Sequence, residues 1–313
     1  MLYGAGREVG IGLVKHPLVK AVGFTGSRAG GRALMDAAAA RPEPIPVYAE
    51  MGSINPVFFL GGVLSQKPEE LAAGLHGSVT LGVGQFCTNP GLIFVERGDG
   101  AKVFLRKLEA LMAATAPGTM LTADLCAAYR TGVEKFSQAA GVKQLALASA
   151  EAGPGNAQAG AALFVTDAET FLANHHLMDE VFGPSTLVIE CASPAQTIAA
   201  AKKLEGQLTA TIHGLPEELD TNCELVEILA SKAGRLVFNG FPTGVEVAHA
   251  MTHGGPYPAT ADGRSTSVGT RAIDRFLRPV SYQNFPDAAL PEELKEANPL
   301  KIARLVDGKL ILP

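Results

Sequence analysis

Short apolar runs alternate with helix-like segments along most of the chain. The runs predict strands at residues 19–25, 47–50, 55–60, 92–96, 162–166, 186–191, 208–212 and 235–239. The segments between them predict helices at residues 32–41, 68–83, 101–114, 125–140, 194–204 and 220–233. This alternation predicts an α/β fold with a largely parallel sheet flanked by helices.

Several segments lie outside this alternation. Residues 4–10 (GAGREVG) look like the middle of a nucleotide-binding crossover, yet no strand precedes them, so we expect the chain to begin inside a domain. The Gly/Ala-rich residues 150–161 are expected to form a surface loop. Residues 278–285 are expected to be extended, and residues 309–312 resemble a strand.

Composition narrows the class of protein. The 313 residues are 47% hydrophobic and 18% charged, which is enough for one large or two medium domains with a core. The net charge of −5 and the lack of a basic cluster argue against a nucleic-acid partner. No uncharged apolar run reaches the roughly 18 residues of a membrane span, and no signal peptide opens the chain, so the cytoplasm is the expected location.

The cysteines and histidines do not form a metal-binding pattern. The four cysteines, at positions 87, 126, 191 and 223, contain no CxxC pair, which argues against a zinc site or a disulfide framework. His249 and His253 are four residues apart, but the glutamate of a metalloprotease helix is missing and a Gly-Gly-Pro turn follows. No metal is therefore expected.

Cys87 lies in a setting unlike that of the other cysteines. An apolar stretch leads into the run Gly84-Gln85-Phe86-Cys87-Thr88-Asn89-Pro90-Gly91, which is rich in small and kinking residues. A thiol at such a turn can be reached by a substrate, and nearby backbone N–H groups can point at the oxygen of a carbonyl that the thiol attacks. A buried structural cysteine is the alternative, because free cysteine is often buried.

Glu50 ends a predicted strand just before a glycine turn, 37 residues ahead of Cys87. A carboxylate that reaches a thiol, or a water beside it, can act as a general base. Taken alone, a glutamate in this position is more often a solvated strand end.

Four motifs occur together in a fixed order. They are Phe24-Thr25-Gly26-Ser27, Glu50-x-Gly52 with Asn55-Pro56, Gly84-Gln85-x-Cys87, and Glu180-Val181-Phe182-Gly183-Pro184. In this order the motifs resemble the aldehyde dehydrogenase superfamily over residues 1–290. Three further segments, at residues 41–50, 241–247 and 253–260, resemble its 2-oxoglutarate semialdehyde (2,5-dioxovalerate) dehydrogenase branch.

The resemblance implies a catalytic pair. Cys87 would be the nucleophile that adds to the aldehyde carbon, and a thioester would remain after hydride leaves for nicotinamide. Glu50 would activate the water that hydrolyses this thioester to a carboxylic acid. The backbone N–H of Cys87 would help to hold the oxyanion.

The resemblance also implies a site for NAD or NADP. Gly26, Ser27 and Gly31 would form the turn and helix start that face the pyrophosphate. Met51 and Gly52 would approach the nicotinamide through their backbone. Glu180 would bind the nicotinamide ribose, and Phe182 would pack beside the nicotinamide ring.

The resemblance implies three regions: a partial Rossmann-type remnant at residues 1–52, a parallel-sheet catalytic domain at 53–275, and a C-terminal arm and tail at 276–313. Members of the superfamily normally carry a longer N-terminal part with an oxyanion-hole asparagine and a ribose-binding lysine. We therefore expect a chain that lacks this part, and its loss could impair activity.

Two alternatives to the dehydrogenase remain open from the sequence. Cys87 and Glu50 could hydrolyse an activated ester without any cofactor. The chain could also be an inactive subunit that only assembles with a full-length partner. A homo-oligomer, a dimer or tetramer, is expected because members of the superfamily pair through a late strand, for which residues 278–285 are the candidate.

Overall fold

The computed structural model describes residues 2, 4, 7–149 and 157–313, which fall into two compact units. The first unit is Met1–Arg275 and the second is Phe276–Pro313. The second unit spans the residues assigned from the sequence to the C-terminal arm and tail, and the role of this region stays a prediction. The division predicted after residue 52 stays a prediction.

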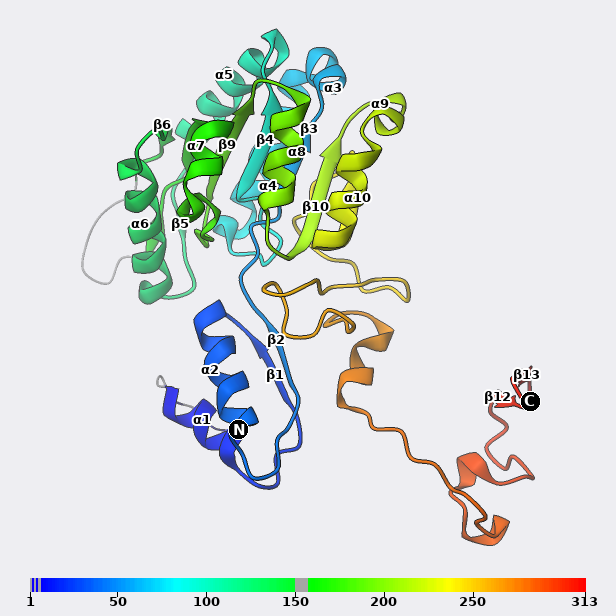
Figure 1. Cartoon of the computed structure of the whole chain (residues 1–313). Coiled ribbons are helices and arrows are strands. Elements are labelled where there is room, and N and C mark those ends of the chain that lie inside the picture. The colour runs from blue at the N-terminus through cyan, green and yellow to red at the C-terminus, as the bar shows by residue number, and fades with distance from the viewer. Residues whose placement is uncertain (1, 3, 5–6, 150–156) are drawn as a thin grey trace. The chain divides into compact units, whose positions relative to one another are not determined.

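The first unit is built on a seven-stranded sheet with the order β11-β10-β3-β4-β9-β8-β6 (Figure 1). Every neighbouring pair is parallel except β6 with β8, which is antiparallel. The predicted α/β class is therefore confirmed. The strands are β3 (Val57–Phe59), β4 (Leu92–Glu96), β6 (Lys143–Leu147), β8 (Ala162–Asp167), β9 (Ser185–Cys191), β10 (Gln207–His213) and β11 (Ala233–Phe238).

Alternation along the central strands builds two apolar layers, one on each face of this sheet. Phe58 and Phe94 stack on one face with their ring centroids 4.5 Å apart, while Phe59 and Val95 face the other layer. The first layer packs against α6 (Ala123–Gln138), α7 (Ala168–Ala173), α8 (Pro194–Lys203) and α10 (Cys223–Lys232). The second packs against α3 (Gly61–Gln66), α4 (Pro68–Thr80) and α5 (Asp99–Ala113).

A second, smaller sheet pairs β1 (Val22–Thr25) with β2 (Val47–Glu50) in parallel. In its register Thr25 lies opposite Glu50, so the Gly26-Ser27 turn and the Glu50-Met51-Gly52 segment leave the same edge. Ligands of parallel α/β sheets bind at this carboxyl edge. In the sequence, helix α1 (Arg7–Lys15) precedes β1, and helix α2 (Arg28–Ala39) lies between β1 and β2.

Several predicted boundaries were wrong for local reasons. Helix α2 begins at Arg28 and not at residue 32, because the Ser27 side chain caps it by accepting from the N–H of Gly30 at 3.2 Å. Helix α4 ends at Thr80 and not at 83, because Gly82 and Val83 adopt left-handed φ angles of 56° and 60°.

Other differences concern elements that the sequence did not reveal. Strand β6 and helices α1, α3 and α7 were not predicted, and the helix expected at 220–233 is split into α9 (Pro216–Thr221) and α10. Residues 150–156 of the expected loop lie outside the described residues. Gln158–Ala159 forms β7, which pairs with β5 (Gly118–Thr119), so this part of the loop prediction was wrong.

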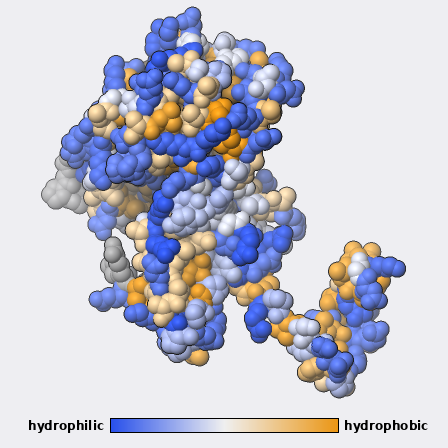
Figure 2. All heavy atoms as spheres, in the orientation of Figure 1, coloured by the Kyte–Doolittle hydropathy of each residue, from blue (hydrophilic) through white to orange (hydrophobic). Residues whose placement is uncertain are grey.

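The second unit carries 3-10 turns and a small hairpin, β12 (Arg304–Val306) with β13 (Lys309–Ile311). Residues 278–285, all of which are described, lie outside any strand. Hydrophobic residues are prominent on its surface (Figure 2), including Leu277, Tyr282, Phe285, Leu310 and Leu312. Within the described residues, no helix has the length and apolar composition needed to cross a membrane.

Candidate active site

Cys87 follows a backbone turn that is unusual in its φ angles. Gly82, Val83 and Gly84 have φ values of 56°, 60° and 65°. A non-glycine residue in this region is strained, so the surrounding packing must hold Val83 there. A Cβ on Gly84 would lie 2.3 Å from the carbonyl carbon and oxygen of Gly183, so the turn packs directly on the Glu180–Pro184 motif.

Replacing Gly84 by alanine is expected to destabilise the fold by about 2–4 kcal/mol and to displace Cys87, because the added methyl meets backbone and the φ angle is left-handed. Gly77→Ala is the matched control. Its Cβ would have no neighbour within 4 Å, and alanine in helix α4 should be neutral or stabilising by about 0.5–1 kcal/mol. Urea unfolding of both variants measures the difference, and equal midpoints would contradict the expectation.

The buried amide of Asn55 fixes the backbone around Cys87. Its Nδ2 donates to the carbonyl oxygens of Cys87 at 2.9 Å and Asn89 at 3.0 Å. Its Oδ1 accepts from the hydroxyls of Ser53 and Thr209 at 2.9 and 3.0 Å. The Cys87 turn is therefore tied to strands β3 and β10 through one side chain.

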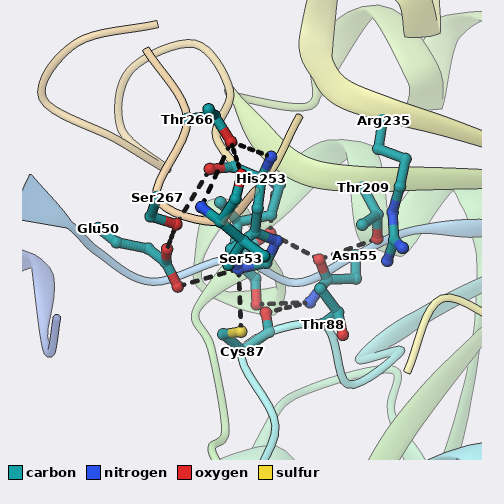
Figure 3. A network of polar contacts seen from close by, with 12 residues as sticks. Glu50, Ser53, Asn55, Cys87, Thr88, Thr209, Arg235, His253, Thr266 and Ser267 are labelled. Carbon is teal, nitrogen blue, oxygen red and sulfur yellow. Dashed lines mark hydrogen bonds and ion pairs between the residues drawn. The ribbon is translucent and has the colours of Figure 1, made fainter. Parts of the chain in front are cut away.

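Cys87, Glu50 and His253 form the centre of the site (Figure 3). The Nε2 atom of His253 lies 3.3 Å from Sγ of Cys87 and 3.3 Å from Oε1 of Glu50. The second carboxylate oxygen, Oε2, accepts from the hydroxyl of Ser267 at 2.8 Å. Glu50 and His253 are only 7% and 4% exposed, whereas Cys87 is half-buried and so open to a substrate.

A loop that folds back onto β2 delivers His253 and Ser267 to Glu50. The N–H of Met51 donates to the carbonyl of Ala259, and the N–H of Ala261 donates to that of Ala49, both at 2.8 Å. The N–H of His253 donates to Oγ1 of Thr266 at 2.8 Å, which fixes the start of the loop.

The surroundings shift the pKa values of Cys87 and Glu50 in opposite directions. Burial, and next the negative charge of Glu50, raise the pKa of the Cys87 thiol to about 12. Burial alone would raise the pKa of Glu50, but the hydrogen bond and charge of His253 and the hydrogen bond from Ser267 outweigh it, so this pKa lies below its ordinary value. The carboxylate is therefore ionised at neutral pH while the resting thiol is protonated.

The structure brings Glu50 and Cys87 together with His253, which the sequence did not indicate as their neighbour. The sequence analysis gave His253 a chemical role only as a metal partner of His249, whose Nδ1 instead contacts Oγ1 of Thr270 at 2.9 Å. The only signal was the His253-Gly254-Gly255-Pro256 segment. The ligand atoms of Glu50, Cys87 and His253 all lie within 4.8 Å of one another, and the expectation of no metal stays a prediction.

Three of the expected cofactor residues line one open groove of about 650 Å³. Ser27, Gly52 and Glu180 line it, together with Arg28 and Lys203. A Cβ on Gly52 would lie 2.6 Å from Oε2 of Glu180, so the two motifs meet here and a larger residue would require the Glu180 side chain to shift. Helix α2 starts in this groove, and its free N–H groups offer a site for an anion such as a phosphate.

The other four expected cofactor residues, Gly26, Gly31, Met51 and Phe182, are not part of the groove lining. Gly31 packs closely on Met51, because a Cβ added to Gly31 would lie 2.7 Å from Cγ and Sδ of that side chain. A larger residue here would require the Met51 side chain to shift. Contact of these residues with a cofactor stays a prediction.

Comparisons with known proteins agree with this geometry. A sequence model described as the aldehyde dehydrogenase family matches residues 1–278. The chain belongs to the aldehyde dehydrogenase family. It is 49% identical over 309 residues to alpha-ketoglutaric semialdehyde dehydrogenase 2 of Azospirillum brasilense, and 46% identical over 306 residues to alpha-ketoglutaric semialdehyde dehydrogenase of Acinetobacter baylyi. These matches cover 99% and 97% of the chain but 58% of each relative.

Solved structures support the same family fold. The chain superposes on a 1-pyrroline-5-carboxylate dehydrogenase with a TM-score of 0.73, covering 89% of this chain and 53% of that one at 20% identity. An NAD⁺ complex of an aldehyde dehydrogenase from Bacillus cereus gives a TM-score of 0.71, covering 87% and 53% at 20% identity. The resemblance to the semialdehyde dehydrogenase branch is confirmed by the two relatives named above.

Proposed function

We propose that the chain carries the catalytic centre of an NAD- or NADP-dependent aldehyde dehydrogenase, whose substrate is 2-oxoglutarate semialdehyde. The observation that carries this proposal is the half-buried Cys87 thiol close to the buried carboxylate of Glu50, in a fold that also holds a groove with a helix start. The substrate is proposed from the names of the two relatives at 49% and 46% identity.

In the first half of the reaction, the Cys87 thiolate adds to the aldehyde carbon and forms a thiohemiacetal. The Asn55 amide holds the Cys87 carbonyl, so the thiolate keeps a fixed direction during attack. The backbone N–H of Cys87 would donate to the oxyanion. The nicotinamide, when bound, supplies the chemistry of hydride acceptance, and a thioester on Cys87 then remains.

In the second half, Glu50 takes a proton from water and the resulting hydroxide attacks the thioester. A carboxylate with a lowered pKa is available as the free base at neutral pH, and Ser267 orients it through Oε2. The acid product leaves and the Cys87 sulfur is regenerated.

The groove offers groups that suit the phosphate and ribose of a dinucleotide. Ser27 and the N–H groups at the start of α2 would bind phosphate, and Glu180 would accept from a ribose hydroxyl beside Gly52. In the proposal Gly26, Gly31, Met51 and Phe182, which are not part of the groove lining, also contribute to binding the cofactor.

We also propose a homo-oligomer, a dimer or tetramer, that uses the second unit. The exposed apolar side chains of residues 276–313 would be covered by another copy of the chain. Analytical ultracentrifugation should show a dimer or tetramer, and a monomer at all concentrations would contradict this part.

The function is tested by mixing the purified chain with 2-oxoglutarate semialdehyde and either NAD⁺ or NADP⁺, and following reduced nicotinamide by absorbance. We expect oxidation of this aldehyde to exceed that of acetaldehyde. Hydrolysis of an activated ester with no reduced cofactor formed would support the thiol esterase instead. No turnover of aldehyde or ester, together with an unreactive Cys87, would indicate a non-catalytic subunit.

A further inference from the structure

The Cys87 thiol must lose its proton before it can attack a carbonyl. Only a few per cent of an ordinary thiol is ionised at pH 7, and burial together with the charge of Glu50 raises the pKa of Cys87 to about 12. The Cys87 site therefore needs a base within hydrogen-bond distance of Sγ.

His253 is in the position of such a base. Its Nε2 lies 3.3 Å from Sγ of Cys87, and the ring is 4% exposed. Glu50, on β2, also acts on this thiol, through its charge and through a hydrogen bond, whereas Glu180 and Arg235 act on it through their charges alone. The same nitrogen of His253 lies 3.3 Å from Oε1 of Glu50.

We propose that His253 is a catalytic residue that accepts the thiol proton of Cys87, and that the Glu50 carboxylate stabilises the imidazolium that forms. This inference rests on the proposed dehydrogenase function. For it, the reacting form of the ring must carry its proton on Nδ1, so that the lone pair of Nε2 faces Sγ. In this form Nε2 donates nothing to Glu50, and the carboxylate keeps its hydrogen bond from Ser267 until the imidazolium forms.

The proton transfer is balanced within the site. The S–H bond of Cys87 breaks and an N–H bond forms at Nε2 of His253, with no change of oxidation state. The new N–H then faces the carboxylate of Glu50. When the thioester is hydrolysed, the departing Cys87 thiolate takes this proton back, while the proton from water passes to Glu50 and then to solvent.

With His253 as the acceptor of the thiol proton, Glu50 remains available as the base that activates water. If Glu50 itself removed the thiol proton, it would be neutral when the water must be activated. Because His253 holds the thiol proton, Glu50 stays ionised through the hydride step, and its second oxygen stays bound to Ser267.

Alkylation of Cys87 by iodoacetamide, followed residue by residue with mass spectrometry, tests the proposal without any cofactor. In His253→Gln the rate at neutral pH should fall about 10²-fold, and the deficit should vanish in strong alkali, where hydroxide ionises the thiol in both proteins. His249→Gln is the matched control, because His249 is exposed and contacts Thr270 rather than Cys87. Rates of His253→Gln within threefold of the wild type at every pH would overturn the proposal.

A second variant separates chemistry from loss of packing. His253→Ala should lose the pre-steady-state burst of reduced nicotinamide by about 10²-fold, and added imidazole should restore part of both the burst and the alkylation rate. An unchanged burst, or a folded variant that imidazole does not rescue, would contradict the proton-acceptor role. If the wild-type chain oxidises no aldehyde, the proposed function fails, while the alkylation comparison still decides the role of His253.

Discussion

Replacing Cys87 with alanine is expected to abolish aldehyde oxidation, with a loss of at least about 10⁴-fold in the rate of cofactor reduction. The reason is that no thiohemiacetal can form without the sulfur, and residues that act as one unit lose nearly all activity when one of them is removed. Steady-state absorbance of reduced nicotinamide measures the loss, and thermal unfolding checks that the fold is kept.

The other cysteines provide the controls for this experiment. Cys126 is buried and donates to the carbonyl of Gln158, Cys191 is buried at the end of β9, and Cys223 is exposed at the start of α10. Cys223→Ala should keep full activity. Residual oxidation above about 1% in Cys87→Ala would show that another group is the nucleophile, and the proposed function would then lose its central residue.

The strands were predictable because burial on both faces leaves a strong mark on the sequence. Residues 57–59 and 92–95 are apolar throughout, and alternate side chains pack into the two core layers. Strand β6 was missed because its exposed positions, including Lys143, dilute the apolar pattern on this edge strand. Helix α7 has only six residues, too few for a periodic pattern to emerge.

Cys87 and Glu50 could be selected from the sequence because they lie in ordered motifs, but the residues around them could not. Asn55 reaches Cys87 across 32 residues, and His253 reaches it across 166. The contacts of His253 depend on the loop that folds back onto β2. Backbone hydrogen bonds of Met51 and Ala261 hold this loop in place, and backbone hydrogen bonds leave no pattern in the amino-acid sequence. The motif also did not reveal that Gly31, expected to face a phosphate, packs against Met51.

Replacing Glu50 with glutamine is expected to slow thioester hydrolysis by about 10²–10⁴-fold while leaving the hydride step much less affected. Glutamine has the same shape and can still contact His253 and Ser267, but it cannot take a proton from water. The first turnover should therefore give a burst of reduced nicotinamide, after which the thioester on Cys87 accumulates. Rapid quenching and intact-protein mass spectrometry would detect this acyl-enzyme, and a variant with neither burst nor acyl-enzyme would contradict the role.

The pH dependence of folding provides an independent check on the same residue. Because the pKa of Glu50 lies below its ordinary value in the folded chain, ionised Glu50 contributes stability above the unfolded-state pKa, and this contribution is lost as the pH falls through the folded-state pKa. Glu50→Gln should therefore be less stable than the wild type at neutral pH and should approach it in acid. Urea unfolding at both pH values measures this difference. A difference in unfolding free energy that stays constant across the acid range would contradict this expectation. It would mean that His253 and Ser267 do not lower the pKa of Glu50.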